Sequence, residues 1–190
     1  MNGMATFPLL SRVLHWLMAV MILAMLFIGL FMASSVGPDY HRLVTLHRPL
    51  GIAILMLAIL RVANRLRSSV PTLPEDLPRL LRRIATTSHI LLYGLMIVLP
   101  FVGWGMLSAG GFPIPLWGQS LLLPPILPHN PALWSWLRSA HTILAFALFG
   151  LVLAHIGAAL FHGLIRRDGV LRSMCVKEAP SPDLQEQKPV

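Results

Sequence analysis

Four long apolar runs, almost free of charged residues, dominate this chain of 190 residues. Each run is about 20 residues long, which at about 1.5 Å per residue lets an α-helix cross the hydrocarbon core of a bilayer. Only 12% of the residues are charged and 56% are apolar, a balance that few soluble domains show. The pattern predicts an all-α integral membrane four-helix bundle in contact with the lipid bilayer. The expected spans cover residues 13–33, 47–64, 85–107 and 139–165.

The chain shows no internal repeat and no second domain, so we expect one membrane domain over residues 1–174. The first run is too long for a signal-peptide core and is expected to stay as a span. Residues 175–190 are polar and are expected to form a disordered tail. The single cysteine, Cys175, excludes a disulfide framework, a Cys-ligated iron–sulfur cluster and c-type haem attachment.

Basic residues predict how the bundle is oriented. Six arginines lie in the last turn of the second run or between it and the third, and five basic residues follow the fourth. The other two loops, with the ends of the runs beside them, hold only Arg42, Arg48 and Arg138. The positive-inside rule therefore places both termini in the cytoplasm. The net charge of +8 thus reflects topology signals beside apolar runs, and we expect no nucleic acid partner.

Four histidines inside the runs carry the main functional signal. His141 and His155 are fourteen residues apart, so on a helix they face the same way about 21 Å apart along the axis. With both termini inside, the depths pair His47 with His141 near the outer face and His15 with His155 near the inner face. An imidazole in a lipid-spanning helix is costly without a partner. Two such pairs predict four axial ligands to the iron of two b haems, one near each face, although hydrogen bonding within the bundle is the simpler alternative.

The residues one helical turn after these histidines are small. A porphyrin lies flat along the helix that carries its ligand, so a small residue there leaves room for it. His89 and His162 are instead followed by Tyr93 and Arg166. Small residues are common in membrane helices, so the pattern supports the four without proving them. The four small residues are Ala19, Gly51, Ala145 and Ala159.

Two further in-span histidines leave alternatives open. His89 enters the third run from the inner side, where it would either replace His15 as the partner of His155 or, as we favour, hydrogen-bond a haem propionate or a quinone carbonyl. His162 lies two turns after His155, where propionate contact, quinone contact and interfacial solvation all remain open. The remaining two histidines, His41 and His129, are expected in solvated loops.

Three arginines stand beside the candidate ligands. Arg48 adjoins His47, and the other two each precede a candidate ligand by one turn. Guanidinium–propionate pairing would offset the cost of burying charge. The alternative is the usual anchoring arginine at the end of a span. The candidates for haem propionate binding are Arg12, Arg48 and Arg138.

Several segments together resemble the bacterial cytochrome b561 family, a branch of the group that includes cytochrome b subunits of nickel–iron hydrogenases and formate dehydrogenases. The resemblance covers residues 12–172. It implies a four-helix bundle with two b haems, in which His15 and His47 each pair with a histidine on the fourth span. The matching segments are SRVLHWLMA, LVTLHRPLGI, SHILLYGLMIVLPFVGWGM, SAHTILAFALFGLVLAHIGAALFH and LIRRDGVLRSM.

The resemblance implies electron transfer in the bacterial cytoplasmic (inner) membrane, with ubiquinone or menaquinone as a substrate. We expect single electrons to move between a periplasmic-side donor, superoxide or a redox protein, and the quinone pool. Some members of this type resemble superoxide:ubiquinone oxidoreductases. We favour a quinone site near the inner face, where His89, His155 and His162 supply polar groups.

Two other functions remain as alternatives. In the first alternative, the chain is the membrane anchor and electron conduit of a periplasmic dehydrogenase or hydrogenase. Co-purification with a catalytic subunit would reveal this role. A haem-free transporter is the second alternative. The predicted spans contain no Asp or Glu, which many ion-coupled carriers use as proton relays, and this argues against a transporter.

Overall fold

Four long helices make up most of the molecule. The computed structural model describes residues 6–68, 77–117 and 121–175. The long helices are α1 (Leu9–Ser34), α2 (Gly37–Arg67), α3 (Arg79–Ala109) and α4 (Pro131–Leu160). The shorter elements are β1 (Ile114–Trp117), β2 (Leu121–Leu123), the π-helical turn η1 (Phe161–Arg166) and α5 (Val170–Cys175).

The surface of the bundle is apolar, as a lipid-facing protein requires. All four long helices are long and apolar enough to cross a membrane. Large apolar side chains point outward, including Val20 (65% exposed) and Phe146 (61% exposed). Exposing such a surface to water would be strongly unfavourable, whereas lipid tails solvate it well. The predicted fold class, an all-α membrane four-helix bundle, is confirmed.

The helices extend beyond the apolar runs. Gly37 has a φ of +65°, which lets the chain reverse after α1, and Pro38 then starts α2 about ten residues before the expected span. His41 therefore lies in the second turn of α2, exposed, and its assignment to a loop was wrong. At the start of α4 the Asn130 side chain accepts a hydrogen bond from the Leu133 N–H, which caps the helix before the predicted span.

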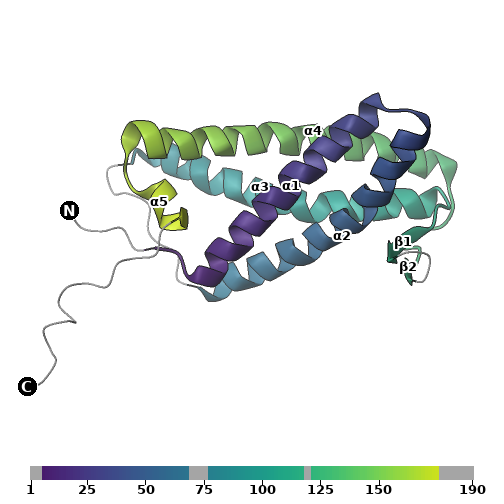
Figure 1. Cartoon of the computed structure of the whole chain (residues 1–190), viewed down its shortest axis with the longest axis horizontal. Helices are drawn as coiled ribbons and strands as arrows, with labels where there is room; N and C mark the ends of the chain where they lie inside the picture. Colours follow the sequence, from purple (N-terminus) through teal and green to yellow (C-terminus); the bar gives the residue numbers. More distant parts are fainter. Residues whose placement is uncertain (1–5, 69–76, 118–120, 176–190) are drawn as a thin grey trace, which may run out of the picture.

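The helices pack as two antiparallel pairs. α1 packs along α2 and α3 along α4, with a further contact between α2 and α3. Figure 1 shows the start of α1 and helix α5 at one end of the bundle and the β1–β2 hairpin at the other. The buried core lies between these ends, around Met18, Ile54, Met96 and Leu148. Leu148 lies midway between His141 and His155 along α4, so the core separates two layers of histidines.

Side-chain hydrogen bonds hold both ends of the bundle. At the hairpin end, Trp104 Nε1 donates to the Pro124 carbonyl (2.9 Å), and the Ser108 hydroxyl accepts from the Ile126 N–H (3.1 Å). At the other end, Trp16 Nε1 donates to the Met174 carbonyl (3.1 Å), which ties α5 back to α1. The tail that we expect to be disordered lies, from residue 176 onward, outside the described residues.

Candidate cofactor site

Two pairs of histidines face each other across the bundle. The imidazole centroids of His47 and His141 are 6.1 Å apart, and those of His15 and His155 are 6.2 Å apart. The first pair, here the hairpin-end pair, joins α2 to α4, and the second, the α5-end pair, joins α1 to α4. Neither helix pairing is among those in close backbone contact. The rings thus meet across the wider gaps of the bundle.

This spacing suits a metal ion between the rings. A metal–imidazole bond of about 2.0 Å on each side places the centroids of two axial ligands about 6 Å apart. Hydrogen bonding through Nδ1 does not hold the hairpin-end pair together, because the Nδ1 atoms of His47 and His141 are buried and make no hydrogen bond within the described residues. Buried imidazoles left this way are costly in an apolar bundle. Both pairs therefore fit axial ligation of a haem iron.

A large cavity surrounds the hairpin-end pair. Its volume is about 420 Å³, and all four long helices contribute to its wall. His47 and His141 line it, as do Gly51 and Ala145, the small residues one turn after them. Its wall is largely apolar, which suits the flat ring of a porphyrin. The small-residue pattern of the sequence therefore coincides with an open space at this pair.

Two glycines lie against the rings of the hairpin-end pair. A Cβ added at Gly103 would come within 3.3 Å of His141 Cε1, closer than side chains normally approach. A Cβ added at Gly29 would lie 4.0 Å from His47 Cε1, an ordinary contact. The lack of a side chain at Gly103 thus leaves room for the His141 ring, whereas Gly29 has room to spare.

The α5-end pair has polar neighbours on every side. Arg61 Nη2 lies 2.8 Å from His15 Nδ1, and Arg61 Nε donates to the Tyr93 hydroxyl (2.9 Å). The His89 ring centroid is 5.4 Å from that of His155, and His89 Nδ1 donates to the Ala85 carbonyl (2.7 Å). The distance between the His89 and His155 rings is thus shorter than the distance between the rings of either facing pair. His89 also already has a hydrogen-bond partner in the backbone.

Guanidinium nitrogens without partners lie near both pairs. The Nε atoms of Arg12 and Arg48 and the Nη1 atom of Arg61 are buried and make no hydrogen bond to any described residue. Arg48 also donates through Nη1 to the Pro113 carbonyl (3.1 Å), while the exposed Arg138 stacks over the Trp134 ring at 5.4 Å. Arg48 and Arg138 both line the large cavity, where a carboxylate would meet them.

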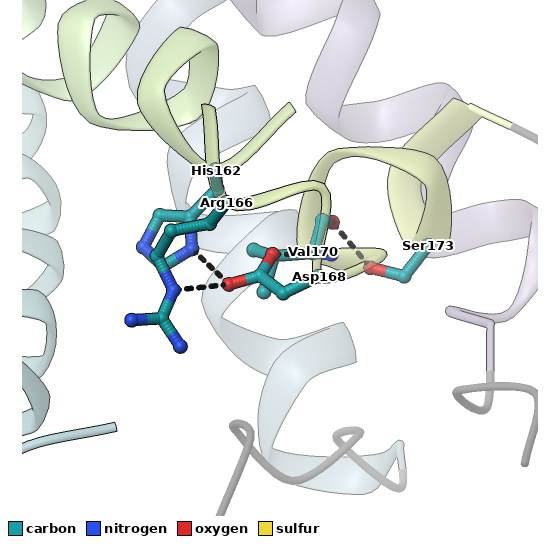
Figure 2. Close-up of polar contacts among 5 residues, drawn as sticks. All are labelled: His162, Arg166, Asp168, Val170 and Ser173. Atoms are coloured by element: carbon teal, nitrogen blue, oxygen red, sulfur yellow. Dashed lines mark hydrogen bonds and ion pairs between the residues drawn. The ribbon is translucent and has the colours of Figure 1, made fainter. Parts of the chain in front are cut away.

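His162 belongs to a separate polar cluster at the α5 end, shown in Figure 2. Asp168 Oδ2 accepts from His162 Nδ1 (2.6 Å) and from Arg166 Nε (3.0 Å), and its Oδ1 accepts from the Val170 N–H at the start of α5 (3.3 Å). Burial alone would raise the pKa of Asp168, but these hydrogen bonds outweigh it and hold the pKa below its usual value. The cluster fixes the turn from η1 into α5.

Sequence reasoning left three residues of these sites unassigned. An arginine at the edge of a short apolar run must reach water or meet an anion, so the sequence indicates a partner for Arg61 without identifying it. Tyr93 was treated only as a bulky neighbour of His89, and Gly103 was not singled out. Nothing in the sequence marks Gly103, because glycine is common in membrane helices.

Together the fold and the paired histidines define a class, a membrane-spanning four-helix bundle of the b-type cytochrome kind. The model of the family described as prokaryotic cytochrome b561 matches residues 6–176. The chain belongs to this family, as its sequence motifs indicated, and is a multi-pass bacterial membrane cytochrome. Membership implies that it binds haem b.

Three curated relatives agree with this assignment. Cytochrome b561 homolog 2 of Escherichia coli (strain K12) is 30% identical over 94% of this chain and 95% of its own length. Cytochrome b561 homolog 1 of the same organism is 28% identical over 85% and 92% of the two chains. The probable superoxide oxidase CybB of Yersinia pestis is 29% identical over 70% and 74%.

Proposed function

We propose that this protein is a dihaem b-type cytochrome that transfers single electrons between a periplasmic-side donor and the quinone pool. The observation that carries the proposal is the pair of cross-bundle histidine contacts at 6.1 and 6.2 Å. His47 and His141 would hold one haem b, and His15 and His155 the other. Bound haem b would supply one-electron transfer, and ligation by two histidines would favour electron transfer over oxygen activation.

The polypeptide would hold each group through its histidines and its arginines. Arg48 and Arg138 line the cavity at the hairpin end, and Arg12 lies one turn before His15. Carboxylates bound there would satisfy the buried nitrogens of Arg12 and Arg48. The largely apolar wall of the cavity would keep water from the hairpin-end pair, which favours electron transfer without side reactions.

The arginine distribution supports a cytoplasmic location for both termini and thus a periplasmic hairpin end in the inner membrane. Two cations, Arg48 and Arg138, line the hairpin-end cavity, whereas Arg42 is offset by Asp39 at 3.6 Å. A cavity lined by cations favours an anionic electron donor. Superoxide fits this charge, and a relative named as a probable superoxide oxidase supports the choice.

Quinone would bind near the α5-end pair. His89 lies beside His155 there, and His162 lies two turns further along the helix. The Nδ1 atoms of both rings are engaged, with Ala85 and Asp168 respectively, so each ring would offer its Nε2 edge to a quinone carbonyl. Whether ubiquinone or menaquinone binds depends on which quinone the host membrane contains.

A haem count on the detergent-purified protein tests the proposal. We expect two b haems by the pyridine assay, a reduced-minus-oxidised spectrum of b type, and reduction by superoxide followed by reoxidation by a short-chain ubiquinone. H162A should keep both haems and slow the quinone step. A protein purified without haem would contradict the proposal. Stable co-purification with a dehydrogenase or hydrogenase subunit, with no response to superoxide, would assign it instead as an anchor subunit.

A further inference from the structure

Arg61 is a half-buried cation that contacts Tyr93 and His15 and shares a small cavity with a second cation, Arg65. Its Nε donates to the Tyr93 hydroxyl, its Nη2 contacts His15 Nδ1, and its Nη1 is buried without any partner among the described residues. The guanidinium also lies over the Tyr93 ring, 5.8 Å from its centroid. Burying a charge without a counter-charge is strongly unfavourable. The position of Arg61 therefore points to an anion.

No described carboxylate can supply that anion. The parts of the chain that the structure describes contain only Asp39 and Asp168 as acidic side chains. Asp39 pairs with Arg42, and Asp168 accepts from His162 and Arg166 at the turn into α5. A bound group that carries its own carboxylate would complete the site.

The contact between Arg61 and His15 has a consequence for ligand binding. A guanidinium only donates hydrogen bonds, so His15 Nδ1 must accept and carries no proton in this arrangement. A metal-bound histidine normally donates through its second ring nitrogen. Ligation through His15 Nε2 therefore favours a state in which Arg61 has released Nδ1 and turned to another acceptor.

A small cavity beside the guanidinium offers such an acceptor a place. Its volume is about 20 Å³, and Ser11, Asn64 and Tyr93 line it together with Arg61. This is room for about one water-sized group, such as one oxygen of a carboxylate. Asn64 Nδ2 donates to Ser11 Oγ (2.7 Å), which holds the polar wall in place.

We propose that Arg61, held by Tyr93, binds a propionate carboxylate of the haem at the α5-end pair and leaves His15 when that haem is present. This inference rests on the proposed function, because it requires a haem between His15 and His155. It adds Arg61 and Tyr93 to the cofactor site. The positive charge of Arg61 then favours the reduced, less positive state of that haem over the oxidised state.

Redox titration of the purified, haem-loaded protein tests this assignment. We expect R61Q to shift one of the two haems about tenfold toward its oxidised form, which is about 59 mV downward for a one-electron couple. The other haem should stay unchanged. Arg67, exposed six residues further along the same helix, provides the control, since R67Q removes the same charge away from the site. Y93F should give a smaller shift of the same sign.

Two results would overturn the assignment. If both haems kept their potentials in R61Q, the missing anion would be a lipid or another group. If the potential rose, Arg61 would have stayed on His15, because its loss would then let Nδ1 regain a proton. Should R61Q lose the haem, R61K must retain it, since the charge is kept, and loss in both variants would also count against the assignment. A parent protein without haem would instead contradict the proposed function itself.

Discussion

The two histidine pairs have the same ring spacing but opposite surroundings. The hairpin-end pair borders a cavity of about 420 Å³, and its buried Nδ1 atoms make no hydrogen bond within the described residues. At the α5-end pair, Arg61 contacts His15 and His89 lies beside His155. The first pair thus faces an apolar cavity, while the second is surrounded by side chains of the protein.

This difference shows how one helix can support two unlike sites. α4 supplies a histidine to each pair, fourteen residues apart, and the apolar core around Leu148 separates them. The partners from α1 and α2 then decide what surrounds each ring. Charged and hydrogen-bonding neighbours at the α5 end should shift the redox potential of the site there. Haem binding at the hairpin end should depend mainly on the space around the rings.

The largest expected effect comes from the candidate ligands of the α5-end pair. H15A should lower the haem count from two to about one, because His89 is 5.4 Å from His155, too close to take over without moving. H89A should keep both haems. The pyridine assay on monodisperse protein measures both variants. Two haems in H15A and one in H89A would make His89 the ligand and reverse this part of the comparison.

The space around the rings should matter at the hairpin-end pair. G103A places a methyl group within 3.3 Å of His141 Cε1, so the ring must move and haem binding should weaken about tenfold. G29A, whose Cβ would be 4.0 Å from His47 Cε1, is the matched control and should bind as the parent does. Haem retention during dilution in detergent reports the difference. Equal retention in both variants would show that His141 tolerates displacement.

Acid should loosen the α5 end specifically. Asp168 has a lowered pKa in the folded protein, so it stabilises the fold above about pH 3.8, and this contribution disappears as the pH falls through its folded pKa. D168N should therefore destabilise the protein by about 1.5 kcal/mol at neutral pH, with the gap closing below pH 3.8. Denaturation midpoints across this range test the prediction, and a gap independent of pH would contradict it.

The carboxylate at the other end should matter least. Asp39 pairs with Arg42 at 3.6 Å, and both side chains are largely exposed, at 75% and 82%. Solvent screens such a pair, so D39A should leave the denaturation midpoint unchanged within error. A loss as large as that of D168N would mean that both ends of the bundle depend on ion pairs.

The sequence predicted the fold well because its signal is local. Each apolar run specifies one span by length and composition, and the depth argument predicted which histidines would face each other. Ligation by those histidines stays a prediction. The start of α2 was misplaced, and His41 with it, because the helix runs through Pro49 and continues toward its N-terminus over polar residues as far as Gly37.

The details of each site depended on contacts between helices. Arg61 reaches His15 only because of how α1 and α2 pack, and helical periodicity does not define that geometry. The close approach of Gly103 to His141 likewise arises from α3 against α4. Such contacts depend on packing between distant segments, which a single sequence does not display.

Haem counts on two double variants would test the pairing of histidines most directly. H47A/H141A removes both members of one pair, and we expect about one b haem to remain. H47A/H155A removes one member of each pair, and we expect none. One haem surviving in H47A/H155A, or none in H47A/H141A, would contradict the pairing of His47 with His141 and His15 with His155.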